Sequence, residues 1–319
     1  MALYTQPVSA SSRPQILLYT ATTGFRHDSI PVAIAALKAK EDEIDIDFFA
    51  TEDPAQFTDE SLARFDAVLF LSTTGDVLDA AGEAAFQRYL NLGGNFVGIH
   101  SAAATLENTT CYVRELGAVF DYHPELQNFT VDVLQPSHPS ASMLPAQWTV
   151  ADEVYNFKSD PRALGAVVVL SANKASYHDP VGSHFDQGEP HPTAWFQEHG
   201  AGVQKGGVAG RSFYTSLGHL NETWQNELFL EHILGGISWV LQANTTRGFN
   251  VNGRVGNPMS INSKSVTTSM LAPQSSNEPN AQHSGTQGNA FSASQVVTGV
   301  ATLLTLGVGQ ILAKKIKLI

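Results

Sequence analysis

The chain of 319 residues contains a single cysteine, Cys111, and this scarcity limits its chemistry. One cysteine cannot form a disulfide within the chain, and its rarity favours a reducing compartment. Cys111 follows Asn108-Thr109-Thr110 and has no run of basic residues beside it to activate the thiol. We therefore expect a structural side chain at this position rather than a nucleophile.

Basic side chains are also scarce, because 18 lysines and arginines stand against 30 aspartates and glutamates, which gives a net charge of −12. An acidic surface does not neutralise phosphates, so nucleic acid is excluded as a partner. Residues 1–14 lack the apolar run of a secretory signal peptide, and we expect none there.

Residues 248–294 lack any periodic apolar pattern and are rich in Asn, Ser, Gln, Pro and Gly, a composition typical of a disordered linker. Residues 296–313 carry no charge and are followed by Lys314-Lys315, a length at the lower limit for a transmembrane helix. The sequence favours a hydrophobic tail over residues 295–319 that anchors a cytoplasmic domain in an intracellular membrane. The alternative is a soluble chain with a disordered tail.

Between these ends, short apolar strands alternate with helices. Strands are predicted at 15–20, 44–49, 67–71, 96–99, 129–133 and 166–170, and helices at 29–40, 80–92 and 224–239. Strands separated by helices of this length form βαβ units on a parallel sheet. We therefore predict one α/β domain over residues 14–245, a flavodoxin-like three-layer sandwich with a mainly parallel sheet.

The segment from Gly93 to Ala102 predicts a reactive position, because an apolar strand ends in a turn of small residues with His100 at its apex. In α/β hydrolases such a turn raises the nucleophile above the carboxyl edge of the sheet. An imidazole there can bind a metal or move a proton, but it is a poor acyl-forming nucleophile. His27 and His219 follow two other predicted strands, so we expect all three histidines around one pocket at this edge.

These residues stand in motifs that resemble the ThuA-like (trehalose utilisation) family, over about residues 14–245. The matching motifs are Thr23-Gly24-Phe25-Arg26-His27-Asp28, the run from Gly93 to Ala102, Phe120 with His123-Pro124, Asp152-Glu153-x-Tyr155, His191-Pro192-x-Ala194-Trp195, Tyr214 to His219, and His232 to Trp239. The resemblance implies the fold of the class I glutamine amidotransferases and the processing of disaccharides such as trehalose, with an oxidised sugar involved. Those amidotransferases carry a cysteine where this chain has His100, so we expect no glutaminase activity.

The polar residues of these motifs define a candidate site for a small carbohydrate. We expect catalysis by His100, Glu153 and His219, and substrate binding by His27, Arg26, Tyr155, His191 and Trp195. His27, His100 and His219 are candidate ligands of a divalent metal such as zinc. Without a metal, Glu153 and a histidine would act as base and acid. The alternative function is a non-catalytic carbohydrate-binding or scaffolding domain held at a membrane by its tail. The sequence does not determine an oligomeric state.

Overall fold

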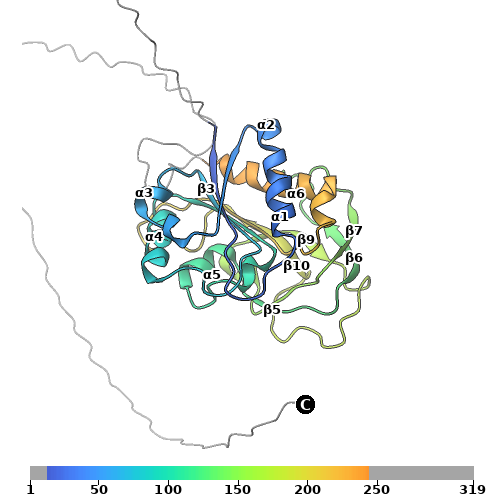
Figure 1. The fold of residues 1–319 in the computed structure, drawn as a ribbon. Coiled ribbons are helices and arrows are strands. Elements are labelled where there is room, and N and C mark those ends of the chain that lie inside the picture. The colour runs from blue at the N-terminus through green and yellow to red at the C-terminus, as the bar shows by residue number, and fades with distance from the viewer. Residues whose placement is uncertain (1–12, 244–319) are drawn as a thin grey trace, which may run out of the picture. The chain divides into compact units, whose positions relative to one another are not determined.

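Nine strands form one sheet at the centre of residues 13–243, the part of the chain that this computed structural model describes (Figure 1). Their order is β2-β1-β3-β4-β11-β10-β9-β6-β7. The strands are β1 (Gln15–Tyr19), β2 (Asp47–Thr51), β3 (Ala67–Leu71), β4 (Asn95–Ile99), β6 (Gln127–Val133), β7 (Gln147–Asp152), β9 (Val167–Ala172), β10 (Pro192–Gln197) and β11 (Ser212–Thr215). A second, two-stranded sheet pairs β5 (Phe120–Tyr122) with β8 (Asn156–Phe157).

Six α-helices connect or follow the strands within the described residues. They are α1 (Ile30–Ala39), α2 (Glu41–Ile44), α3 (Asp59–Leu62), α4 (Ala80–Asn91), α5 (Thr110–Leu116) and α6 (Glu227–Leu241). Short 3-10 turns occupy Pro54–Gln56, His100–Ala104, Pro161–Leu164 and Thr223–Gln225. From β1 to β4 the helices connect the strands in the βαβ pattern that the sequence predicts, whereas no α-helix separates the strands from β6 to β11.

The direction of the strands decides where the functional edge lies. The pairs from β2 to β11 are parallel, and the pairs from β11 to β7 are antiparallel. Strands β9 and β7 therefore point the same way as β1, β3, β4 and β11, whereas β10 and β6 oppose them. The α/β class and the mostly parallel sheet are as predicted.

Both faces of the sheet are covered, which makes three layers. Along β1, Ile16 and Leu18 pack into the core beneath α1 and α6, whereas Leu17 and Tyr19 pack into the core beneath α3, α4 and α5. This alternation follows from the two-residue period of a strand, and it holds because both faces are buried. Figure 1 shows α1 and α6 together, away from α3 and α4.

Several predicted elements end where expected, and the differences have local causes. The strand over residues 67–71 is found with the predicted bounds. The second strand begins at Asp47 instead of residue 44, because Ile44 lies in α2 and Asp45 turns the chain with a φ of 56°. The helix predicted over 224–239 is interrupted at Asn226, whose side chain accepts a hydrogen bond from the Phe229 N–H and caps α6.

The predicted linker (248–294) and tail (295–319) lie outside the described residues, so the membrane anchor stays a prediction. Over residues 13–243, none of the helices combines the length and the apolar character needed to cross a bilayer.

Helix α5 carries two buried ionisable groups. Burial raises the pKa of Cys111 to about 11, as expected for a structural thiol. Glu115 is fully buried, and burial raises its pKa to about 8. Its Oε2 accepts a hydrogen bond from the Gly202 N–H at 3.0 Å, and a Cβ at Gly200 would clash with its carboxyl group. Glu115 therefore fits its site as a neutral acid.

We predict that Glu115→Gln removes a pH-dependent loss of stability. In the unfolded chain a glutamate has a pKa of about 4.3, so between this value and about 8 only the folded state holds the proton. The folded protein must then lose stability as pH rises, by up to about 1.4 kcal/mol per pH unit. Denaturant unfolding across this pH range should show that the free energy of unfolding falls with pH for the native chain and changes less for Glu115→Gln. Glu60→Gln, at an exposed glutamate of α3, serves as the control; a profile for Glu115→Gln as steep as the native one would contradict the assignment.

Candidate metal centre

The sheet brings six chemically active side chains to one edge. His100 directly follows β4, Glu153 directly follows β7, and His27 and His219 stand in the loops after β1 and β11. His123 and His191 come just before β6 and β10, the two strands of opposite direction. Because the start of a reversed strand lies beside the ends of its neighbours, all six lie at the carboxyl edge of the parallel strands.

The backbone of His100 has a φ of 54°, a left-handed conformation that residues other than glycine rarely adopt. Its backbone is held from two sides: the Tyr214 hydroxyl donates to the His100 carbonyl at 2.8 Å, and the Ser72 N–H donates to the Ile99 carbonyl at 3.1 Å. A left-handed conformation of this kind costs about 1–3 kcal/mol and persists only where surrounding contacts enforce it. The strained turn raises the imidazole above the sheet, as the sequence predicts.

The ring of His100 has its orientation and tautomer fixed from below. Its Nδ1–H donates to the Ser216 carbonyl at 2.7 Å, which leaves Nε2 with a lone pair. Three polar atoms approach that nitrogen: His27 Nε2 at 3.0 Å, Tyr155 Oη at 3.1 Å and His219 Nδ1 at 3.4 Å. One lone pair accepts one strong hydrogen bond, so these groups cannot all be satisfied by His100.

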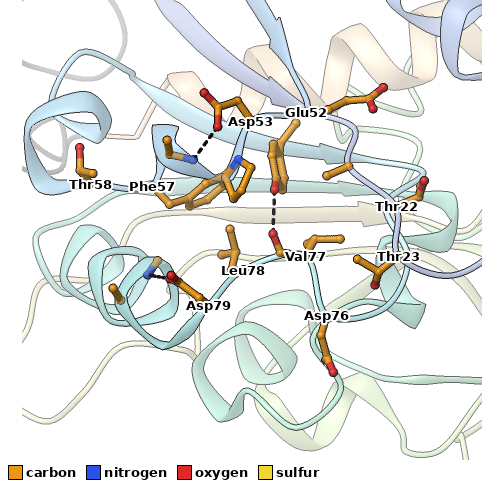
Figure 2. A pocket seen from close by; sticks show the side chains of 16 residues that line it. Thr22, Thr23, Glu52, Asp53, Phe57, Thr58, Asp76, Val77, Leu78 and Asp79 are labelled. Carbon is orange, nitrogen blue, oxygen red and sulfur yellow. Dashed lines mark hydrogen bonds between the residues drawn. The ribbon is translucent and has the colours of Figure 1, made fainter.

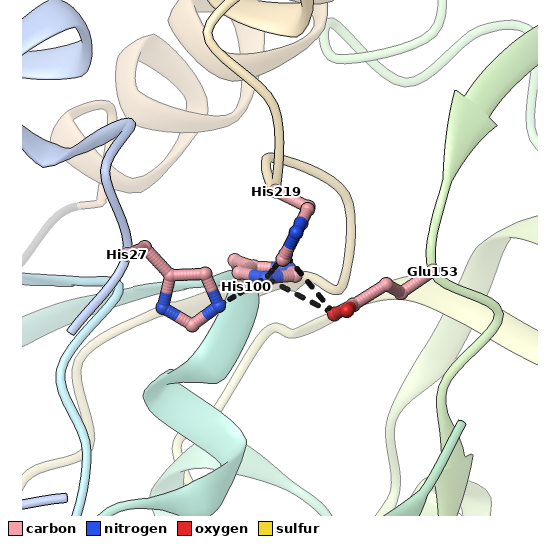
Figure 3. Close-up of side chains that lie close together, drawn as sticks. All are labelled: His27, His100, Glu153 and His219. Carbon is pink, nitrogen blue, oxygen red and sulfur yellow. Dashed lines mark hydrogen bonds and ion pairs between the residues drawn. The ribbon is translucent and has the colours of Figure 1, made fainter. Parts of the chain in front are cut away.

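Glu153 closes the group on its other side (Figure 3). Its Oε2 lies 3.2 Å from His219 Nδ1 and 3.6 Å from His100 Nε2. Its other oxygen, Oε1, lies 3.2 Å from His123 Nε2. Glu153 therefore has one oxygen toward the three histidines and one toward His123, which is 34% exposed.

Burial and charge assign different protonation states to these groups. Burial lowers the pKa of His100 well below its usual range and that of His27 to about 4, so both rings are neutral at pH 7. The hydrogen bond with Glu153 raises the pKa of His219. Burial raises the pKa of Tyr155 far above its usual range, which keeps the phenol protonated. The centre thus contains two neutral imidazoles, an imidazole paired with a carboxylate, and a phenol donor.

The donor set and spacing fit a divalent cation. One ligand atom each from His27, His100, Glu153 and His219 lies within 4.8 Å of the other three. Ligand atoms of a tetrahedral zinc ion are about 3.4 Å apart, which follows from bond lengths of about 2.1 Å, and the contacts above lie close to this spacing. The outer nitrogen of a metal-bound histidine normally has a hydrogen-bond partner. His100 Nδ1 has the Ser216 carbonyl, and His27 Nδ1 has Ser101 Oγ at 3.3 Å.

Asp152 holds two loops of the centre in place. Its carboxylate accepts hydrogen bonds from the backbone N–H groups of Glu153 and Gly218, both at 2.8 Å, and of His219 at 3.3 Å. Gly218 has a φ of 130°, a conformation open to glycine that turns the chain toward the site. The fully buried Asp152 thereby joins the end of β7 to the loop after β11.

Three of the predicted binding residues are not part of the cluster of His27, His100, Glu153 and His219. Trp195 is fully buried and donates from Nε1 to the Leu116 carbonyl at 2.7 Å, so its prediction as a sugar-stacking residue is wrong. His191 is buried, with its Nε2 at 2.8 Å from the Tyr155 carbonyl, and it supports Tyr155 from behind. Arg26 is exposed and pairs with Glu52 at 2.6 Å.

His123 and Asp152 contribute to the centre, although the motifs in which they stand predict no role for them. His123 is separated from Glu153 by 30 positions, and the pairings of β6 with β7 and of β5 with β8 bring them together. For Asp152 a signal was available, since an acid directly before a candidate site residue at a strand end is well placed to accept backbone N–H groups.

Comparison with known proteins identifies the family. A profile of the ThuA family, described as trehalose utilisation, matches residues 15–240. The chain belongs to the ThuA family. Among solved structures, a ThuA-like protein from Bacteroides uniformis is 22% identical, with a TM-score of 0.58 over 77% of this chain and 99% of its own. A ThuA-like protein from Parabacteroides merdae is 18% identical, with a TM-score of 0.54 over 73% and 91%. No curated protein matches the sequence.

We predict that Asp152→Asn loosens the centre of this ThuA domain. In asparagine only the amide oxygen accepts hydrogen bonds, whereas both oxygens of Asp152 do. One backbone N–H therefore loses its buried partner at a cost of about 1–3 kcal/mol. Because Glu153 and His219 both depend on this carboxylate, affinity for a divalent ion should fall about 10–100-fold, as for other supports of metal ligands. Thermal unfolding and metal titration measure the two effects. Asp132→Asn, at the other end of the β6–β7 pair, should change neither; equal metal affinities of both variants and the native chain would contradict the role of Asp152.

Proposed function

We propose that this ThuA domain is a metal-dependent enzyme that acts on a disaccharide or keto-sugar. The observation that carries the proposal is the crowding of donor atoms around His100 Nε2. His100 Nε2 has one lone pair for these three neighbours, whereas a cation at the centre would serve one ligand atom from each of His27, His100, Glu153 and His219 at once. The description of the family as trehalose utilisation supports a sugar as the substrate class.

In this proposal His27, His100 and His219 hold the ion, and the neutral state of the first two suits them as nitrogen ligands. A divalent ion with three protein ligands keeps an open position, where it polarises a sugar carbonyl or hydroxyl or activates a water. Because the hydrogen bond with Glu153 raises the pKa of His219, a metal ion competes with a proton at this residue, and metal uptake should release protons.

Glu153 is suited to act as the general base. Its Oε2 faces the centre, within reach of a proton on a sugar hydroxyl or an attacking water bound there. Its Oε1 contacts His123, which is open to solvent and can pass the proton outward. Tyr155, protonated and 3.1 Å from His100 Nε2, is placed to donate to a substrate oxygen.

We predict that the purified protein contains about one divalent ion per chain and that Glu153→Gln keeps this ion but loses activity. His27→Ala and His219→Ala remove ligands and should lower the metal content several-fold. Removing a general base typically costs about 10²–10⁴-fold in rate. Elemental analysis gives the metal content, and NMR of trehalose and its keto derivatives with the protein follows turnover.

The matched control is His184→Ala, an exposed histidine paired with Asp121 away from the centre, which should change neither quantity. Full activity after complete removal of metal, or unchanged turnover in Glu153→Gln, would refute the proposal. Sugar binding without turnover in the metal-loaded protein would favour the alternative, a carbohydrate-binding domain without catalysis.

A further inference from the structure

A cavity of about 760 Å³ lies at the carboxyl edge of the sheet, beside the loop that carries His27 (Figure 2). Its lining comes from the end of β1 and the loop after it, the turn after β2, the loop after β3 and the first turn of α4. This volume is in the range of sites that bind small molecules. None of the residues that line the cavity belongs to the centre of His27, His100, Glu153 and His219.

The cavity stands at a switch in strand order. From β1 the chain goes to β2 on one side, whereas β3 and β4 follow on the other. The loops after β1 and β3 therefore diverge, and ligands of open α/β sheets bind in the crevice that such a divergence opens. Thr22 and Thr23 come from the first of these loops, and Asp76 comes from the second.

The lining favours an uncharged ligand with many hydroxyl groups. Apolar side chains, Phe57, Val77 and Leu78 among them, offer a surface for the C–H face of a ring. Figure 2 shows the carboxylates of Glu52, Asp53, Asp76 and Asp79 around these side chains, with Thr22, Thr23 and Thr58. Carboxylates and threonine hydroxyls accept hydrogen bonds from sugar hydroxyls. No lysine or arginine is among the lining residues, and Arg26, the cation that contacts the lining residue Glu52, is already paired with that carboxylate, so a phosphorylated or carboxylated ligand would face an excess of negative charge.

One short loop connects the cavity to the metal centre. Thr23 lines the cavity and His27 belongs to the centre, and four residue steps span at most about 14 Å. Phe25 lies between them in the sequence, and it is 67% exposed. Its ring makes an edge-on contact with the His27 ring, with the two ring centroids 4.8 Å apart. The loop is tied down, since Thr74 Oγ1 donates to the Phe25 carbonyl at 2.8 Å and the Thr23 N–H donates to the Thr74 carbonyl at 2.9 Å. Phe25 is thus an apolar ring held in solvent by an ordered backbone.

We propose that the cavity is a subsite for one ring of a neutral disaccharide, and that Phe25 supports the sugar between this subsite and the metal centre. The inference rests on the proposed function for its substrate class and adds a place and a charge preference. The second ring of the sugar reaches the metal centre across the loop from Thr23 to His27. Phosphorylated disaccharides are rejected.

The test is calorimetric titration of trehalose and trehalose 6-phosphate into the full-length protein, both as purified and after treatment with a chelator. Ala81→Phe places a ring in the cavity from an exposed position of α4, and Ala84→Phe, exposed on the same helix but outside the lining, is its control. Phe25→Ala removes the platform, and Phe49→Ala, at an exposed phenylalanine of β2, is its control. Metal content and melting temperature are measured for every variant.

We expect Ala81→Phe to abolish trehalose binding and Phe25→Ala to weaken it about tenfold, as expected for loss of one stacking contact. Both controls should bind like the native chain, and metal content should stay unchanged throughout. Trehalose 6-phosphate should bind at least tenfold more weakly than trehalose. Asp76→Asn removes one negative charge from the lining and should reduce this difference in affinity. After treatment with a chelator, the native chain should still bind trehalose, more weakly than the protein as purified, and the Ala81→Phe variant should not bind it.

The outcomes separate this inference from the proposed function. If Ala81→Phe binds trehalose like the native chain while chelation abolishes binding, the metal centre alone holds the sugar and the subsite is refuted. If chelation leaves binding and turnover unchanged but Ala81→Phe abolishes both, the subsite stands and the metal-dependent function fails. Equal affinity for trehalose and its phosphate overturns the charge preference, and no binding of either sugar overturns the inference as a whole.

Discussion

The hydrogen bond from His100 Nδ1 to the Ser216 carbonyl is the interaction on which the candidate metal centre depends. It joins the turn after β4 to the segment after β11, two parallel neighbours in the sheet. Because the Ser216 carbonyl accepts this hydrogen bond, the ring proton stays on Nδ1, and the lone pair of Nε2 faces His27, His219 and Glu153. The opposite tautomer would present a proton to that group and remove a ligand. The nitrogen ligand that we propose at His100 therefore depends on a backbone carbonyl placed by the register of two strands.

The antiparallel half of the sheet supplies what the parallel half lacks. In the parallel half, β1, β4 and β11 end in loops with histidines but without a carboxylate in the cluster. The chain then reverses direction with each strand from β11 to β7, so that β7 again ends at the functional edge and presents Glu153 there. Because β6 begins at that edge, His123 stands before it and reaches Glu153. Even the buried His191 follows this rule, since it precedes β10 and supports Tyr155.

How far the sequence predicts this site depends on the range of the interactions. The grouping of His27, His100 and His219 was predictable, because parallel strands end at one edge whatever their order. The contacts of His123 were not predictable, since they need the pairings of β6 with β7 and of β5 with β8, and the sequence pattern predicts none of β5, β7 and β8. The prediction that Trp195 stacks on a sugar is wrong, because a sequence motif does not distinguish a tryptophan that contacts a ligand from one that packs in the core. Its indole N–H satisfies a core carbonyl, and only the fold shows that partner.

The contrast between His232 and His100 shows what separates a structural histidine from a functional one. Both rings are fully buried, and burial lowers the pKa of both. His232 has one partner for each nitrogen: the Ser140 carbonyl at 2.7 Å and Thr215 Oγ1 at 3.0 Å. Its hydrogen-bonding capacity is filled, and the ring locks α6 onto β11. His100 has one nitrogen filled and one crowded by several groups that compete for the same lone pair. The crowding of polar atoms at His100 Nε2, and not burial, therefore distinguishes the two rings, and it is the feature that supports a cation at His100 in the function proposed above.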